Sequence, residues 1–313
     1  MFGVYFWELI LYNISGIFLE RTYLMEEKKR TPVKLNRVLY YILLAIFAGT
    51  FCVSLFLLGK YWLNSGQNTS DYDDLANLLA SIQANQTTTA PTLPDTSLPD
   101  TTVPSGTVAP NAPTEPTEPT EPEMLPEYKV FYDLNNDTVG WICIPDTKIN
   151  YPVMQSPSNK DYYLKHTFYK QWSDWGAIYA REDCDINAPS DNITLYGHHM
   201  MDGSMFAQLD FFKKKDFWET HQTFSFDTLY EHHTYQIIAV FKTSGTTGKG
   251  FPYHRFVNAK TEAEFNEFIT TIKGMAFYET GLTAEYGDKL LCLSTCEYTQ
   301  DNGRFVVVAK RIS

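Results

Sequence analysis

The chain has 313 residues and a formal net charge of −12 at pH 7. An acidic balance of this size argues against nucleic acid, or an anionic membrane surface, as its partner. The length allows one or two domains, and the composition changes sharply enough along the chain to separate several segments.

The N-terminal segment, residues 1–37, precedes the first long apolar run. Its stretch 2–19 is apolar but carries Glu8 in the middle, which weakens the case for a membrane span there. Met25 begins a more ordinary leader with several basic residues. We therefore expect the true start at Met25, with residues 1–24 a mis-assigned start, and a cytoplasmic N-terminus.

Residues 38–59 form an apolar segment of 22 residues without a charge. A helix of that length spans roughly 33 Å, enough for a bilayer core of about 30 Å. Only Lys60 follows closely, whereas five basic residues precede the segment: Lys28, Lys29, Arg30, Lys34 and Arg37. This asymmetry predicts a cytoplasmic N-terminus and an extracellular remainder. A cleaved signal peptide is the alternative, but no small-x-small pattern follows Leu58, so we expect a retained single-pass anchor in the cell membrane.

Residues 60–127 are interpreted as an extracellular stalk rich in Thr, Pro and Glu. From residue 65 to 126 small and polar residues dominate, and residues 113–123 read PTEPTEPTEPE. Such a segment buries too little to offset the entropy of ordering itself. Its proline-rich part is expected to be extended, at about 3.1 Å per residue. A plain spacer with no required reach is the alternative.

Residues 128–313 have the composition of a globular domain long enough for one buried core. Most segments predict short strands, because apolar residues run or alternate between turn residues. The expected strands are 139–145, 148–154, 176–180, 192–198, 223–229, 233–244, 289–296 and 304–312.

Helices are expected to be few in this domain. Short ones are predicted at 204–211 and 216–221, and a longer one at 261–275, where Thr261 and Glu264 form a capping box. Seven or eight strands with few helices predict a mostly β fold, a closed barrel or sandwich with a helical insertion between late strands.

Four cysteines lie in the exported region, namely Cys143, Cys184, Cys292 and Cys296. Extracellular cysteines usually form disulfides. Cys292 and Cys296, however, are separated by roughly 13 Å along one strand, which is beyond disulfide reach. We therefore expect at least one free thiol.

Cys296 ends one predicted strand and Arg304 begins the next, so the two side chains lie together if the strands are neighbours. A thiol nucleophile needs a base or a cationic partner. Among seven histidines His198 is the best placed, because it ends a predicted strand. The residues alone leave other interpretations open: a buried cysteine is more often a small hydrophobe, and His198 with His199 could belong to a metal site, although the pattern is weak.

These residues resemble the active-site signature of sortases, the membrane-anchored cysteine transpeptidases of Gram-positive bacteria. The string LSTC at 293–296 followed by Arg304 carries the resemblance. Other stretches that follow the family's order are 139–155, 161–164, 176–180 and 196–209. The stretch YGHHMMDGSMF and the long late helix are most similar to class B.

The resemblance implies a closed sortase-type barrel and a role for each matching residue. His198 matches the catalytic histidine, Cys296 the nucleophile and Arg304 the arginine; Thr295, beside Ser294, matches the substrate pocket. The implied reaction cleaves the C-terminal sorting signal of a secreted protein after threonine. A thioester forms, and the protein passes to an amine of the peptidoglycan stem peptide or its precursor. No metal or cofactor is expected.

Two departures from the family and three alternatives accompany this interpretation. The family often has Thr at Cys292 and Asn at His199. A pilin-polymerising or mainly hydrolytic sortase would keep the fold and change the acceptor. A papain-like peptidase is disfavoured because its cysteine precedes its histidine, whereas His198 precedes Cys296 here. The non-enzymatic alternative is a stalked surface interaction module with a structural cysteine.

Overall fold

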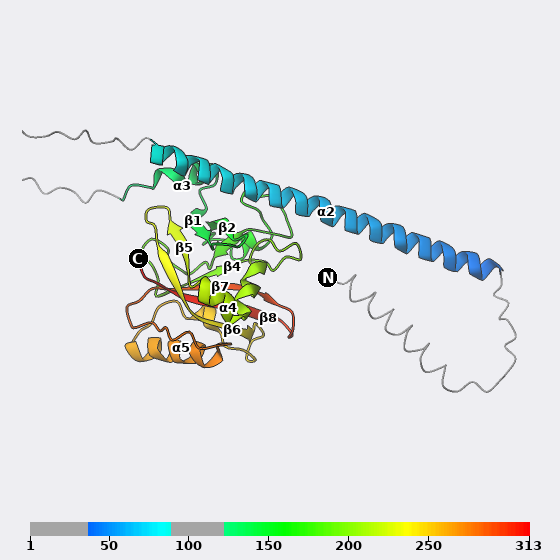
Figure 1. Cartoon of the computed structure of the whole chain (residues 1–313). Coiled ribbons are helices and arrows are strands. Elements are labelled where there is room, and N and C mark those ends of the chain that lie inside the picture. The colour runs from blue at the N-terminus through cyan, green and yellow to red at the C-terminus, as the bar shows by residue number, and fades with distance from the viewer. Residues whose placement is uncertain (1–36, 89–121) are drawn as a thin grey trace, which may run out of the picture. The chain divides into compact units, whose positions relative to one another are not determined.

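The computed structural model describes residues 37–88 and 122–313 (Figure 1). The expectations about residues 1–36, and those about the stalk between residues 89 and 121, lie outside this part of the chain. Two compact units are distinguished, Met1–Asn68 and Thr69–Ser313.

Helix α2, Arg37–Thr88, contains the predicted span 38–59. By length and composition it is, within the described residues, the one helix that could cross a membrane, with the candidate span at Arg37–Gln86. This agrees with a single-pass anchor near the N-terminus.

The structure corrects the assignment of residues 60–88 to a stalk, because α2 continues to Thr88. Within the second unit, Tyr72, Leu75 and Leu79 are buried at a spacing that places them on one helix face. The Tyr72 hydroxyl donates a hydrogen bond to the Gly176 carbonyl at 2.8 Å. Although this stretch is mostly polar in composition, it contains an apolar stripe. The stretch therefore packs as a helix instead of remaining extended.

A closed eight-stranded barrel forms most of the second unit, in the order β1-β2-β3-β4-β7-β8-β6-β5. The strands are β1 Thr138–Cys143, β2 Asn150–Met154, β3 Ile178–Ala180, β4 Asn192–Tyr196, β5 Thr223–Thr228, β6 Thr234–Ser244, β7 Leu290–Glu297 and β8 Gly303–Arg311. Each lies within or close to a predicted strand. The mostly β, closed-barrel prediction is therefore confirmed.

The helices are short except for α5, Glu262–Met275. Thr261 caps α5 by accepting a hydrogen bond from the Glu264 N–H at 3.2 Å, as predicted. The others are α3 Pro126–Leu134, η1 Tyr162–Leu164, η2 Ala207–Lys213, α4 Lys215–Thr220 and η3 Tyr253–Arg255. Helix α3 was not expected, and the helix predicted from residue 204 is a 3₁₀ helix beginning at Ala207.

Two pairings of β7 position the candidate site. On one side β7 pairs in parallel with β4, with Tyr196 opposite Ser294. On the other side it pairs antiparallel with β8. The carboxyl ends of β4 and β7 therefore meet the amino end of β8 at one rim of the barrel.

Candidate active site

Cys296 and Arg304 are direct partners in the β7–β8 register. Both residues are partly exposed, and the predicted neighbourhood of the two is confirmed. Arg304 Nη1 donates to two carbonyl oxygens of its own turn, those of Asn302 at 3.4 Å and Gly303 at 2.9 Å. Its remaining guanidinium donors are free to meet a ligand, since a guanidinium carries five N–H groups.

His198 follows the end of β4 and is held from two sides. The N–H of Gly197 donates to the Ser294 carbonyl at 3.1 Å, which continues the β4–β7 pairing to the residue before the histidine. His198 Nε2 lies 2.8 Å from the carbonyl oxygen of Leu164. Because a carbonyl only accepts, Nε2 carries the hydrogen, and Nδ1 is left as the proton-accepting atom of the neutral ring. Burial lowers the pKa of His198, so the neutral ring is favoured.

All five predicted site residues line one cavity of about 290 Å³: His198, Ser294, Thr295, Cys296 and Arg304. The wall also carries cations that are already paired. Arg181 makes a two-point contact with Asp183, with Nη2 at 2.9 Å from Oδ2, and Lys160 lies 3.5 Å from Glu182. Among the described residues of the wall, Arg304 is the cation without a carboxylate partner.

The hydroxyl groups of Ser294 and Thr295 differ in their hydrogen bonding. Ser294 Oγ lies 2.6 Å from the hydroxyl of Tyr253, and both residues are buried. Thr295 Oγ1 is buried and has no hydrogen-bond partner within the described part of the chain. Tyr253 also lines the cavity. It could not be identified from the sequence, because a single tyrosine in a connection carries no motif.

A family model described as a Sortase domain matches residues 142–312, more than half of the chain. The chain belongs to the sortase family. Within it, the sortase B of Listeria monocytogenes is 32% identical over 193 residues, covering 61% of this chain and 76% of the relative. The sortase B of Staphylococcus aureus is 32% identical over 189 residues, covering 60% and 75%. These relatives identify a cysteine transpeptidase of the class B type.

Solved structures agree with this assignment. A Bacillus anthracis protein similar to sortase B matches with a TM-score of 0.55 at 32% identity, covering 62% of this chain and 86% of that chain. A Staphylococcus aureus sortase B–substrate complex matches with a TM-score of 0.63, covering 80% and 99%. At 24% identity this second similarity is evidence for the fold alone.

His199, the neighbour of His198, is not among the residues that line the cavity. Its Nε2 lies 3.0 Å from Asp210 Oδ2, and its ring packs edge-on against Tyr298 with centroids 5.3 Å apart. Burial opposes ionisation of Asp210, but hydrogen bonds from His199 and Lys213 lower the pKa of this carboxyl. The interpretation of His198 and His199 as two ligands of one metal thus has no support in the geometry.

The other cysteines of the sortase domain are poorly suited to act as nucleophiles. All five cysteines of the chain are free thiols, so the expectation of at least one free thiol is confirmed. Cys292 is 0% exposed, and burial raises its pKa. Burial also raises the pKa of Cys184, to about 11. Cys296, partly exposed at the cavity, is the thiol best placed to meet a substrate.

Proposed function

We propose that this sortase cleaves a C-terminal sorting signal after threonine and transfers the secreted protein to an amine of the cell-wall peptide. Cys296 is the nucleophile, Arg304 binds the developing negative charge, and His198 carries the proton. One observation supports these roles above all: Cys296 and Arg304 are opposite each other in the β7–β8 pair, and His198 lines the same cavity.

In the first step Cys296 passes its thiol proton to Nδ1 of His198, and the resulting thiolate attacks the carbonyl carbon of threonine. The guanidinium of Arg304 donates hydrogen bonds to the oxygen on which charge develops, a task suited to a cation that keeps its proton. His198, protonated at both nitrogens, gives one proton to the departing amine while Nε2–H stays on the Leu164 carbonyl. Cys296 is then a thioester, and the C-terminal peptide has left.

In the second step an amine of the acceptor attacks the thioester. Neutral His198 takes a proton from the amine at Nδ1, the sulfur of Cys296 leaves, and a new amide joins the protein to the acceptor. The low pKa of His198 favours the neutral form that this step needs. Water in place of the amine would give hydrolysis.

We further propose that α2 anchors the enzyme in the cell membrane, with the N-terminus in the cytoplasm and the barrel outside. The basic residues before the apolar stretch support this orientation. A substrate that is itself tethered to the membrane would then be held on the same side of the membrane as the barrel.

The test is intact-mass analysis of the full chain in detergent, incubated with sorting-signal peptides of the Asn-Pro-x-Thr and Ser-Pro-x-Thr type. We expect a mass increase equal to the peptide up to its threonine, lost in Cys296→Ala. The matched control is Cys143→Ala, which removes another partly exposed thiol and is expected to keep the adduct. An adduct that survives in Cys296→Ala would overturn the proposal.

The acceptor is identified in the same experiment. Adding a stem-peptide amine, a pilin-type lysine peptide or no amine distinguishes wall anchoring from polymerisation and hydrolysis. We expect the thioester to be discharged fastest by the stem-peptide amine. Discharge by lysine peptide or by water alone would keep the catalytic roles and replace the acceptor.

A further inference from the structure

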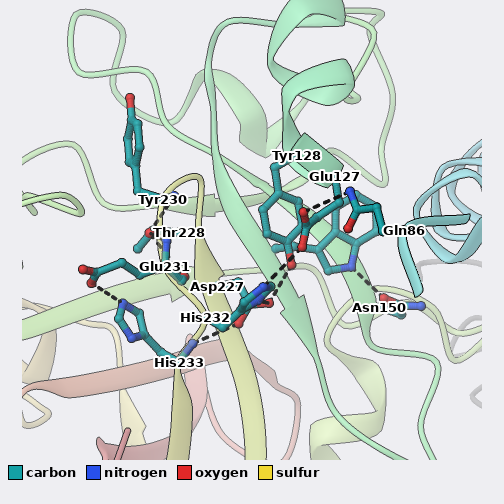
Figure 2. A network of polar contacts seen from close by, with 11 residues as sticks. Gln86, Glu127, Tyr128, Asn150, Asp227, Thr228, Tyr230, Glu231, His232 and His233 are labelled. Carbon is teal, nitrogen blue, oxygen red and sulfur yellow. Dashed lines mark hydrogen bonds and ion pairs between the residues drawn. The ribbon is translucent and has the colours of Figure 1, made fainter. Parts of the chain in front are cut away.

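A second cluster of charged side chains lies where α3 meets the β5–β6 hairpin, and it shares no residue with the Cys296 cavity. Figure 2 shows its members pointing toward one another from three separate parts of the chain. Glu127 and Tyr128 come from α3, Asp227 from β5, and His232 from the turn before β6. The mechanism proposed above uses none of them.

Asp227 is the centre of this cluster. It is buried and accepts three hydrogen bonds: from the Tyr128 hydroxyl at 2.6 Å, from His232 Nδ1 at 2.8 Å and from the His233 N–H at 3.0 Å. These donors replace the water that a buried carboxylate would otherwise bind. The Tyr128 bond joins α3 to the barrel directly.

His232 is placed between two carboxylates. While Nδ1 meets Asp227, Nε2 lies 3.2 Å from Glu127 Oε1. Glu127 is buried as well, at 6% exposure. A neutral imidazole has one N–H and one lone pair, so one carboxylate would then face a lone pair; only the cation donates to both. Its side chain is 55% exposed, so solvent can supply or remove the proton.

We propose that cationic His232 is a proton-dependent clasp that fastens α3 to the β5–β6 hairpin. Loss of its proton removes one of the two imidazole donors, so either Asp227 or Glu127 then faces a lone pair of the ring. Gln86, near the end of α2, also donates to Glu127 Oε2 at 3.4 Å (Figure 2). The clasp thus gathers the segments on either side of residues 89–121 at one point of the barrel.

The direction of the pH effect follows from the charges that face His232. Burial opposes its protonation, but Asp227 and Glu127 outweigh burial and raise the pKa of His232. A group whose pKa is raised by folding stabilises the folded state below its unfolded value, and this contribution is lost as the pH rises through the folded value. The clasp is therefore closed while His232 is protonated and both carboxylates are charged, and it opens as the pH rises through the raised pKa of His232.

The remaining titratable groups around the clasp do not replace His232. Burial and then Arg311, on β8, lower the pKa of His233, whose Nε2 is also 3.4 Å from Glu231. Burial and the neighbouring carboxylate Asp227 raise the pKa values of Tyr128 and of Cys143 on β1, so both stay protonated. Among the described groups of the cluster, His232 is the one that bridges two carboxylates.

The test is hydrogen–deuterium exchange of the full chain in detergent from about pH 5 to about pH 9, which brackets the ordinary histidine pKa. After correction for intrinsic exchange, we expect α3 protection to fall by up to about tenfold per pH unit between the ordinary histidine pKa and the raised pKa of His232, and to level off above the raised value. In His232→Gln we expect weak α3 protection at every pH. Protection of α3 that is independent of pH in the wild type, or unchanged in the variant, would overturn the clasp.

Two controls keep the result specific. His221→Gln removes another histidine–carboxylate contact, that with Asp146 at 3.1 Å, and should retain the wild-type α3 profile. Glu127→Gln keeps His232 but removes one carboxylate; with carbon-13-labelled histidine, one imidazole signal should titrate at a lower pH than in the wild type. If no imidazole signal moves, the clasp is refuted even where His232→Gln does not fold.

Discussion

The hydroxyl of Tyr253 lies 2.6 Å from Oγ of Ser294, and both residues are buried. Ser294 is two residues before Cys296 in the sequence. Tyr253 belongs to η3, in the connection between β6 and α5, whereas Ser294 is part of β7. The bond therefore ties the connection that forms one wall of the cavity to the strand that carries the proposed nucleophile. Burial raises the pKa of Tyr253 to about 12, which keeps the hydroxyl protonated.

Removing this bond should destabilise the sortase without removing a proposed catalytic group. Tyr253→Phe leaves the buried Ser294 hydroxyl without its partner, and we expect a loss of about 1–3 kcal/mol in the free energy of unfolding. Ser294→Ala should cost a similar amount, and the double variant less than the sum of the two. Urea unfolding of the four proteins measures this coupling. Strict additivity would show that the contact contributes nothing.

The second prediction concerns Arg304 and its free donors. Arg304→Lys keeps the charge but loses the planar set of donors, and we expect acyl-enzyme formation to slow roughly 100- to 1,000-fold. The matched control is Arg181→Lys, since Arg181 lines the same cavity but is already paired with Asp183. Single-turnover acylation with a sorting-signal peptide measures both. Equal losses in the two variants would mean that the guanidinium donors of Arg304 have no role that those of Arg181 lack.

The barrel and the placement of Cys296 beside Arg304 could be predicted because their signals are local. Buried strands are runs of apolar residues, and β7 and β8 are nearly continuous runs separated by a short polar turn. Strands that follow each other so closely pair as a hairpin. The register then places the last residues of one strand opposite the first residues of the next.

The missed features depend on contacts between distant parts of the chain. Tyr72 bonds to Gly176, 104 residues away, and nothing in the polar sequence around Tyr72 indicates that partner. The same holds for Tyr253, 41 residues from Ser294, and for Glu127, which meets His232 across a large sequence gap. The local composition of such segments indicates polar stretches or linkers, whereas tertiary packing makes them helical.

The pH dependence of acceptor transfer should follow His198. Burial lowers its pKa below the ordinary value of about 6.5. The neutral form accepts the proton, so transfer should be constant around neutral pH and fall only below that lowered pKa. The rate of thioester discharge by an amine, corrected for the separately titrated ionisation of that amine, measures the profile. A midpoint at or above the ordinary histidine value would contradict the assignment of His198 as the base.

The position of His198 should also depend on the small size of Gly197. A Cβ at Gly197 would lie 2.5 Å from Ile178 Cδ1 and 2.7 Å from the ring of the buried Phe206. Gly197→Ala should therefore overpack this corner, cost about 1–3 kcal/mol in stability and displace His198 from the cavity. The matched control is Gly274→Ala in α5, where a Cβ meets nothing within 4 Å, so that alanine should stabilise by up to about 1 kcal/mol. Unfolding free energies and acyl-enzyme yields of both variants measure the contrast, and a Gly197→Ala protein as stable and active as the wild type would show that the corner adapts without moving His198.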